Sequence, residues 1–326
     1  RDAPAAERDR SASLNTTPGE LVEDGGLSVR LEWNLRDDIT LTSLTSLRDW
    51  ENTQIDADAD FVPADLFILN EPADIENFSQ ELNLLLPLRR RGNTTDDILL
   101  GFYYANEDYG SQFGVETGHD ADNYLNALIS SLRGATACLP GVVAVDCLFP
   151  VGIGALLADG QLSRTIFEQE SESIAAYAHA RISLTEKLGL VTGLRYTIED
   201  KEGGADNPYW YDSPIVRQIL AMGGVPDDGT PRNGFDLIGT FYSPSFHAGT
   251  RDDDTTGLLS LQYDFNDSLM IYGGFHRGYK AGGVNLFREA VVTNTTTYEP
   301  EEPNSVKAGI KADYLGGRAR TNVAIF

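Results

Sequence analysis

The sequence predicts an all-β protein of antiparallel strands, and three observations predict it. Apolar and polar residues alternate strictly along several segments, as in Leu27–Leu35, which is the pattern of a strand with one apolar face. Turns of a few residues join most of these segments into hairpins, and long connections of about 25 to 60 residues separate the hairpins. Short turns at one end and long loops at the other are typical of a transmembrane β-barrel, and a soluble sandwich has no reason to show them.

Five hairpins follow one another along the chain, so we expect about ten strands. They pair residues 27–35 with 39–47, 78–86 with 98–106, 176–184 with 188–196, 259–265 with 269–275, and 302–312 with 318–326. The second hairpin has a basic connection that contains Arg89, Arg90 and Arg91.

The register of the third hairpin places its apolar residues on one face. If Leu184 pairs with Leu188, Ile182 lies opposite Leu190 and Ala180 lies opposite Thr192. The same arithmetic applies to the hairpin at 259–275. Such an apolar face fits lipid contact and a sandwich core equally well, so the alternation of loop lengths is what favours the membrane.

The charge of the chain excludes one class of partner. It has 326 residues, of which 41% are hydrophobic, and 50 acidic against 25 basic side chains give a net charge of −25. We expect no nucleic-acid binding, because no cluster of cations is available to replace counterions along phosphates. Residues 49–76 hold nine carboxylates and no Lys or Arg, and residues 200–254 repeat this bias. We interpret both as solvated loops, with a calcium site as the sharper alternative.

The usual signatures of enzymes and metal proteins are missing. The sequence has no phosphate-binding glycine loop, zinc-protease motif or nucleophile elbow, so we expect no catalytic residue, no cofactor and no metal site. Cys138 and Cys147 lack the spacing of a zinc site; they are either a disulfide that closes a small loop or two unrelated thiols. The apolar run at 138–158 is interrupted by Pro140 and Pro150 and does not predict a membrane helix.

Aromatic residues mark the predicted strand ends, as expected of a membrane-interface girdle. They are Trp33, Trp50, Phe102, Tyr103, Tyr104, Tyr196, Tyr263, Tyr272 and Phe275. The histidines His179 and His276 fall on the polar parity of their strands and would face a lumen.

The most distinctive segment is Arg277–Asn285. Gly278, Gly282 and Gly283 permit backbone angles or close approaches denied to other residues, and they are interleaved with the donors Arg277, Lys280 and Asn285. The segment directly follows a predicted strand. It therefore predicts a tight polar crossing at a strand end.

These motifs resemble the barrel of a TonB-dependent outer-membrane receptor of the iron-complex type. The family has a strand that ends in an aromatic residue followed by Arg/Lys-Gly-Tyr/Phe-Lys-x-Gly-Gly-x-Asn, which matches Phe275, Arg277, Gly278, Tyr279, Lys280, Gly282, Gly283 and Asn285. A Tyr-x-Pro-Glu stretch at 298–301 and Gly-Arg-x-x-x-Asn-x-Ala-x-Phe at 317–326 follow in the family's order. Shorter matches lie at 78–81, 101–104 and 193–197. The sequence departs from the family in the strand after the Pro-Glu stretch, where the family usually has a Glu in place of Val306 or Lys307.

The resemblance implies a division of the chain and a function. Residues 1–26 are a polar lead-in, and 27–326 are an incomplete barrel without a recognisable plug or closing strands, since the family barrel has about 22 strands. We expect localisation in the outer membrane of a Gram-negative bacterium and contact with outer-membrane lipid. The implied activity is energised uptake of a small-molecule ligand such as a ferric siderophore, with the TonB complex acting through a plug that this chain lacks.

The resemblance also suggests which polar residues contact a plug or a ligand. These candidates are the residues expected to face the lumen: Arg181, Arg195, Gln262, His276 and Arg277. Their alternative role is simple polarity of a wet wall. Two other functions stay open, namely a secreted or surface β-protein that binds glycans and a passive porin.

Overall fold

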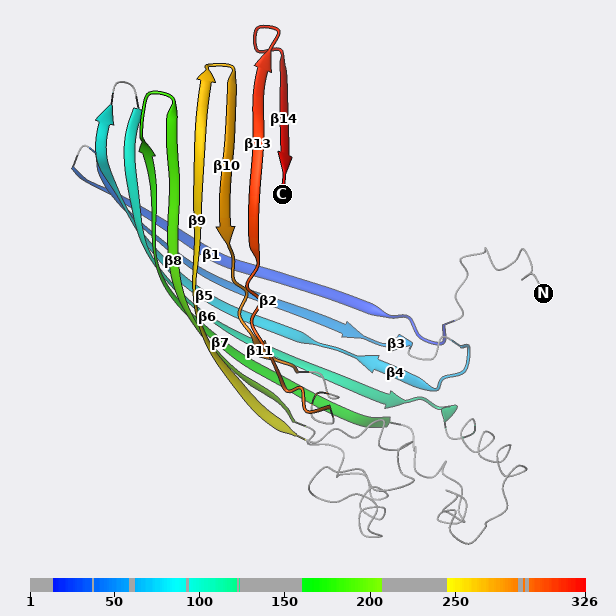
Figure 1. Ribbon diagram of the computed structural model, residues 1–326. Helices are drawn as coiled ribbons and strands as arrows, with labels where there is room; N and C mark the ends of the chain where they lie inside the picture. The colour runs from blue at the N-terminus through cyan, green and yellow to red at the C-terminus, as the bar shows by residue number, and fades with distance from the viewer. Residues whose placement is uncertain are drawn as a thin grey trace.

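Ten long strands form one curved antiparallel sheet in the computed structural model of the protein (Figure 1). The structure describes residues 14–36, 38–58, 62–91, 94–121, 123, 160–206, 245–286, 290 and 293–326. The long strands are β1 (Gly19–Arg36), β2 (Ile39–Ile55), β5 (Ala73–Arg91), β6 (Thr94–Thr117), β7 (Gly160–Ser183), β8 (Leu188–Asp206), β9 (Phe246–Asn266), β10 (Leu269–Arg277), β13 (Asn304–Tyr314) and β14 (Ala319–Ile325). Four short strands complete the set: β3 (Ala57–Asp58), β4 (Phe67–Asn70), β11 (Gly283–Val284) and β12 (Thr297–Tyr298).

The long strands are neighbours in the order of the chain, from β1 at one edge of the sheet to β14 at the other. The short turns lie together at one end, and the long connections leave from the other end (Figure 1). The sheet curves but does not close. The predicted all-β fold, an incomplete antiparallel barrel of about ten strands with alternating turn lengths, is therefore confirmed.

Several strands are much longer than the alternation predicted. β7 begins at Gly160, and β9 begins at Phe246 rather than Leu259. β1 begins at Gly19, before the expected boundary at Leu27. The prediction that the acidic segments are loops was wrong in part, because Asp49 lies in β2 and Asp252 lies in β9. A strand needs only about 9 to 11 residues to cross a bilayer, so these strands continue well beyond it on the side of the long connections.

Strand pairing confirms the predicted register and separates the two faces. Ile182 pairs with Leu190 and Ala180 with Thr192, while Leu259 pairs with Phe275. We call the face that carries Leu194 the outer face and the opposite face, which carries Arg195, the inner face. Apolar side chains of the outer face are open to the surroundings, with Leu194 61% exposed. A sandwich would bury them against a second sheet, whereas a lipid-facing wall leaves them exposed.

Aromatic residues occupy both faces, so the predicted interface girdle cannot account for all of them. Trp33, Tyr196 and Tyr263 share the outer face with the apolar residues. Tyr103 and Tyr272 belong instead to the inner face, as does Trp50 through its pairing with Asp24. Alternation within each strand decides this division, because neighbouring residues point to opposite sides of a sheet.

No helix in the described part of the chain is long and apolar enough to cross a membrane. Cys138 and Cys147, as a disulfide or as two unrelated thiols, lie outside the described residues, as does the apolar run at 138–158.

Candidate functional site

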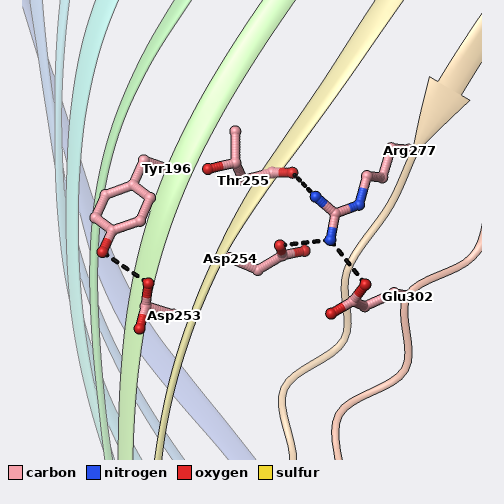
Figure 2. Close-up of polar contacts among 6 residues, drawn as sticks. All are labelled: Tyr196, Asp253, Asp254, Thr255, Arg277 and Glu302. Carbon is pink, nitrogen blue, oxygen red and sulfur yellow. Dashed lines mark hydrogen bonds and ion pairs between the residues drawn. The ribbon is translucent and has the colours of Figure 1, made fainter.

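Arg277 links the end of β10 to β9 and to the chain that returns toward β13. Its Nη1 donates to the Thr255 carbonyl oxygen at 2.9 Å, and its Nη2 lies 2.8 Å from both Asp254 Oδ1 and Glu302 Oε2 (Figure 2). The Asp254 side chain is only 9% exposed, against 34% for Arg277. A buried carboxylate requires a charged partner, so Arg277 neutralises Asp254 where the chain leaves the sheet. Strand parity would place Arg277 beside Phe275 on the outer face, but β10 ends here and the guanidinium turns to Asp254.

The segment after Arg277 forms a narrow double strand that we call the inner ribbon, residues 278–285 and 296–303. Its two arms are joined by backbone hydrogen bonds from Gly278 to Pro303 and from Lys280 to Glu301, and by the pairing of β11 with β12. The ribbon lies against β8 and β9, and the Gly282 amide donates to Asp252 Oδ2 at 3.1 Å. Asp252 belongs to the inner face. The predicted polar crossing is therefore confirmed, and it turns inward over the sheet.

Two positions of the motif require glycine because another part of the ribbon approaches the backbone too closely for a side chain, and not because the backbone angles are unusual. A Cβ on Gly282 would lie 2.5 Å from the Tyr298 carbonyl oxygen, and one on Gly283 would lie 2.5 Å from the Tyr298 hydroxyl. Neither glycine has a positive φ. Ala281 and Val284 beside them are buried, so the ribbon packs tightly where it crosses the sheet.

Tyr279 lies in the ribbon close to a group of carboxylates. Burial, and then the negative charges of Asp252, Glu199, Asp254 and Asp253, raise the pKa of Tyr279 to about 12. Its hydroxyl and Asp254 Oδ2 are buried and have no hydrogen-bond partner in the part of the chain that the structure describes. The ribbon thus brings a neutral phenol to an acidic wall at physiological pH.

Arg195 belongs to a second polar group, deeper along the inner face. Its guanidinium carbon lies 5.2 Å from the ring centre of Tyr103 and 5.4 Å from that of Tyr177. The Tyr177 hydroxyl donates to Glu81 and to Asn83 Oδ1, at 2.7 Å for the latter. The Tyr177 ring occupies the space above Gly101 of the neighbouring strand, where an added Cβ would lie 2.0 Å from the ring. Glycine and tyrosine therefore form a matched cross-strand pair that fixes the tyrosine.

Four of the predicted site residues lie on the inner face by strand parity, Arg277 reaches it from the end of β10, and the five do not form one site. Gln262 and His276 line a pocket of about 310 Å³ between β8, β9, β10 and β13. Arg195 and Arg277 belong to the separate groups described above. Arg181 pairs with Val191 and Asp97 nearer the short turns.

Sequence reasoning missed several inner-face residues that complete these groups. They are Glu81, Tyr177, Asp252, Asp254, Lys307 and Lys311. Parity would have found most of them, since Lys307 and Lys311 share the parity of Gly309, and Tyr177 shares that of His179. The close approach of the ribbon to Asp252 had no local signal.

The acidic segments do not gather into a cation site within the described ranges, where no three metal-ligating side chains of the His, Cys, Asp or Glu type lie together. Asp65 shows what one of them does instead. Its carboxylate accepts hydrogen bonds from the Asn15 side chain and the His119 amide, at 2.9 and 3.0 Å. The carboxylate ties the start of the chain to two connections at this end of the sheet.

A family comparison identifies the class of protein. Residues 3–326 match the model described as TonB dependent receptor-like, beta-barrel. The chain therefore belongs to the TonB-dependent receptor family, a family of transport receptors of the outer membrane of Gram-negative bacteria, and the resemblance found in the sequence is confirmed.

Three solved structures with the same fold carry the names of iron-complex receptors. The siderophore receptor PiuA from Acinetobacter baumannii matches with a TM-score of 0.58 and 16% identity, over 94% of this chain and 40% of PiuA. The ferric yersiniabactin uptake receptor FyuA from Yersinia pestis matches with a TM-score of 0.56 and 14% identity, over 92% and 34% of the two chains. The ferric-catecholate import receptor Fiu from E. coli K12 matches with a TM-score of 0.54 and 11% identity, over 96% and 41%. The chain thus spans about a third to two fifths of their lengths.

Proposed function

We propose that this protein acts in the outer membrane as a receptor for TonB-dependent uptake of a scarce nutrient, and that the nutrient is a ferric siderophore or another iron complex. The observation that carries this proposal is the division of one sheet into an exposed apolar outer face and a polar inner face against which the inner ribbon is held. A wall of this kind separates lipid from a wet lumen. Membership of the family and the iron-complex receptors among its structural neighbours support the choice of ligand.

Each face has a separate role in the proposed mechanism. The outer face contacts outer-membrane lipid. On the inner face, Arg181, Arg195, Gln262 and His276 form the polar wall that a plug or a passing ligand meets. Arg277 joins them from the end of β10, where its guanidinium reaches the inner-face carboxylate of Asp254. Energy reaches the lumen from the TonB complex through a plug domain, and the chain contributes the wall of the path, with no catalytic step.

The test is uptake of ⁵⁵Fe by iron-starved cells, supplied as the ferric complex of the siderophore that the same cells secrete. Disruption of the gene should abolish saturable uptake, and the gene supplied on a plasmid should restore it. Uptake should also disappear when tonB is deleted and the receptor is still produced. Unchanged uptake after disruption of the gene contradicts the proposal.

The same cells separate a receptor from a passive porin. A porin would admit small solutes at a rate that is proportional to their concentration and independent of TonB. Saturable uptake that requires TonB therefore excludes the porin, whereas linear uptake that persists without TonB supports it. The exposed apolar face of the single curved sheet favours a lipid-facing wall over the glycan-binding alternative.

A further inference from the structure

The inner-face pocket between β8, β9, β10 and β13 collects cationic and hydrogen-bonding groups. It is lined by Gln262, Tyr272, His276, Lys307 and Lys311, with Val191, Leu258, Ser260, Met270 and Gly274 completing the walls. All of these residues belong to the inner face of their strands. The pocket is therefore part of the lumen wall, at the depth of the membrane-spanning part of the sheet.

Tyr272 lies between the two lysines and is fixed there. It pairs with Gly309 across β10 and β13, and a Cβ on Gly309 would lie 2.5 Å from its ring. The ammonium groups of Lys307 and Lys311 lie 6.0 and 5.7 Å from the ring centre. Each distance is within the range of a cation–π contact, so one aromatic ring holds two cations beside the pocket.

Neither lysine has a carboxylate partner among the residues that the structure describes. Two other cations of the inner face do have one: Arg48 lies 2.7 Å from Asp24, and Arg320 lies 2.6 Å from Asp313. Two neighbouring ammonium groups repel each other unless an anion lies between or beside them. In a chain with a net charge of −25, this local excess of positive charge is unusual, and it attracts an anion into the pocket.

We propose that this pocket is an anion subsite on the transport path that takes a carboxylate-bearing group of the transported ligand. Lys307 and Lys311 supply the charge, Gln262 and His276 supply further donors, and the Tyr272 ring positions the lysines. The subsite acts after capture of the ligand at the extracellular side, because it lies on the wall below the inner ribbon. This inference rests on the proposed function for its ligand, but its chemistry can be tested without transport.

The first test measures binding of a simple carboxylate, citrate, to the full-length protein purified in detergent. Lysine side chains are acetylated with a small amine reagent, and the extent of modification at each lysine is measured by mass spectrometry with and without citrate. Citrate should slow modification of Lys307 and Lys311 about tenfold and leave the turn residue Lys187 unchanged, and added salt should remove the protection.

Two results overturn the subsite. Equal modification of Lys307 and Lys311 with and without citrate shows that the pocket does not bind carboxylates. The second result is that neither lysine reacts in the absence of citrate but both react once the plug has been deleted. This result would show that a protein side chain fills the pocket in place of a ligand group.

The second test measures ⁵⁵Fe uptake in cells that produce the double variant Lys307→Gln/Lys311→Gln. The uptake rate should fall about tenfold while binding of the ferric complex at the cell surface is unchanged, and Lys307→Arg/Lys311→Arg should restore the rate. A matched control, Lys187→Gln/Arg318→Gln, removes two cations from the short turns and should transport normally. Normal transport by the first variant contradicts the subsite, whereas citrate protection without any iron uptake in the unmodified protein contradicts only the proposed function.

Discussion

Arg277 shows how much of the site depends on a single side chain. It satisfies a buried carboxylate on β9, a backbone carbonyl beside it and a carboxylate of the returning chain (Figure 2). A guanidinium can reach these three acceptors together because it holds five N–H donors in one plane. Glu302 is half exposed, so its contact contributes little energy, and the contact with Asp254 is the one that matters for stability.

We predict that Arg277→Ala lowers the free energy of unfolding by roughly 2 kcal/mol, because it leaves Asp254 charged and unpaired. Asp254→Asn added to this variant should recover part of the loss, since the buried charge is then gone. The measurement is guanidinium-induced unfolding of the protein reconstituted in lipid vesicles, followed by tryptophan fluorescence. Strictly additive effects of the two substitutions would contradict the pairing.

The glycine beneath Tyr177 gives a second prediction for a single residue. Gly101→Ala should destabilise the protein by about 1 to 3 kcal/mol, because the new methyl group displaces a ring that holds Glu81 and Asn83. Gly189→Ala is the matched control: an added Cβ there meets no atom within 4 Å, and we expect a change within about 0.5 kcal/mol. The same unfolding measurement compares them, and equal effects would refute the argument from close approach.

At the scale of elements, each strand presents apolar side chains to one face of the sheet and polar side chains to the other. On β8, Leu194 lies on the outer face and Arg195 beside it lies on the inner face. Alternation along the strand is sufficient to produce this division, because consecutive side chains point to opposite sides. The inner ribbon differs from the strands, since only its contacts with β8 and β9 hold it over the sheet.

We predict that Leu194→Arg costs about 2 to 4 kcal/mol of unfolding free energy in lipid vesicles, the range for a cation on the lipid face near the middle of the bilayer. Ser46→Arg is its control, at a similar distance from a short turn but on the inner face among Ser28 and Ser79. We expect it to cost less than about 1 kcal/mol. If both variants lose the same amount, the assignment of the faces is wrong.

The ribbon gives a prediction that depends on pH. The pKa of Tyr279 is raised to about 12, above its ordinary value of about 10, so the folded ribbon favours the neutral phenol. The stabilisation it adds is present below about pH 10 and is lost as pH rises from about 10 to 12. The difference in absorbance at 295 nm between the unmodified protein and Tyr279→Phe should show one phenol with a midpoint near 12, and a midpoint near 10 would contradict this environment.

At the scale of the whole molecule, the two ends of the sheet differ in how far the chain extends beyond the apolar band and in the charge that it carries there. The short turns fold within a few residues, whereas the strands continue far past the apolar band on the other side and carry Asp49, Asp74 and Asp200 there. Carboxylates lie where water is present, so this end projects from the membrane. The orientation expected for the family places it outside the cell.

An epitope inserted between Val62 and Pro63, in the connection between β2 and β5, should therefore bind antibody on intact cells. The same epitope inserted between Asp267 and Ser268, in the turn between β9 and β10, should bind antibody only after the outer membrane is permeabilised. Immunofluorescence before and after permeabilisation measures both. Reversed accessibility would show that the chain has the opposite orientation.

The sequence by itself determined the number, order and register of the long strands, as the pairing of Ile182 with Leu190 shows. It did so because alternation and short turns are local signals with a period of two residues. Motif residues also located the crossing that begins at Arg277. Strand length was not predictable in the same way, because beyond the apolar band both faces are polar and the alternation disappears.

Only the tertiary structure decided which polar residues meet. Arg277 and Asp254 belong to different strands, β10 and β9, and their contact depends on where β10 ends. The hydrogen bond from Arg277 to Thr255, which lies 22 positions earlier in the sequence, depends on the same point. The pairing of Tyr272 with Gly309, which sets two lysines beside one pocket, joins separate strands. Contacts of this kind follow from the packing of distant segments, for which a single sequence carries no periodic signal.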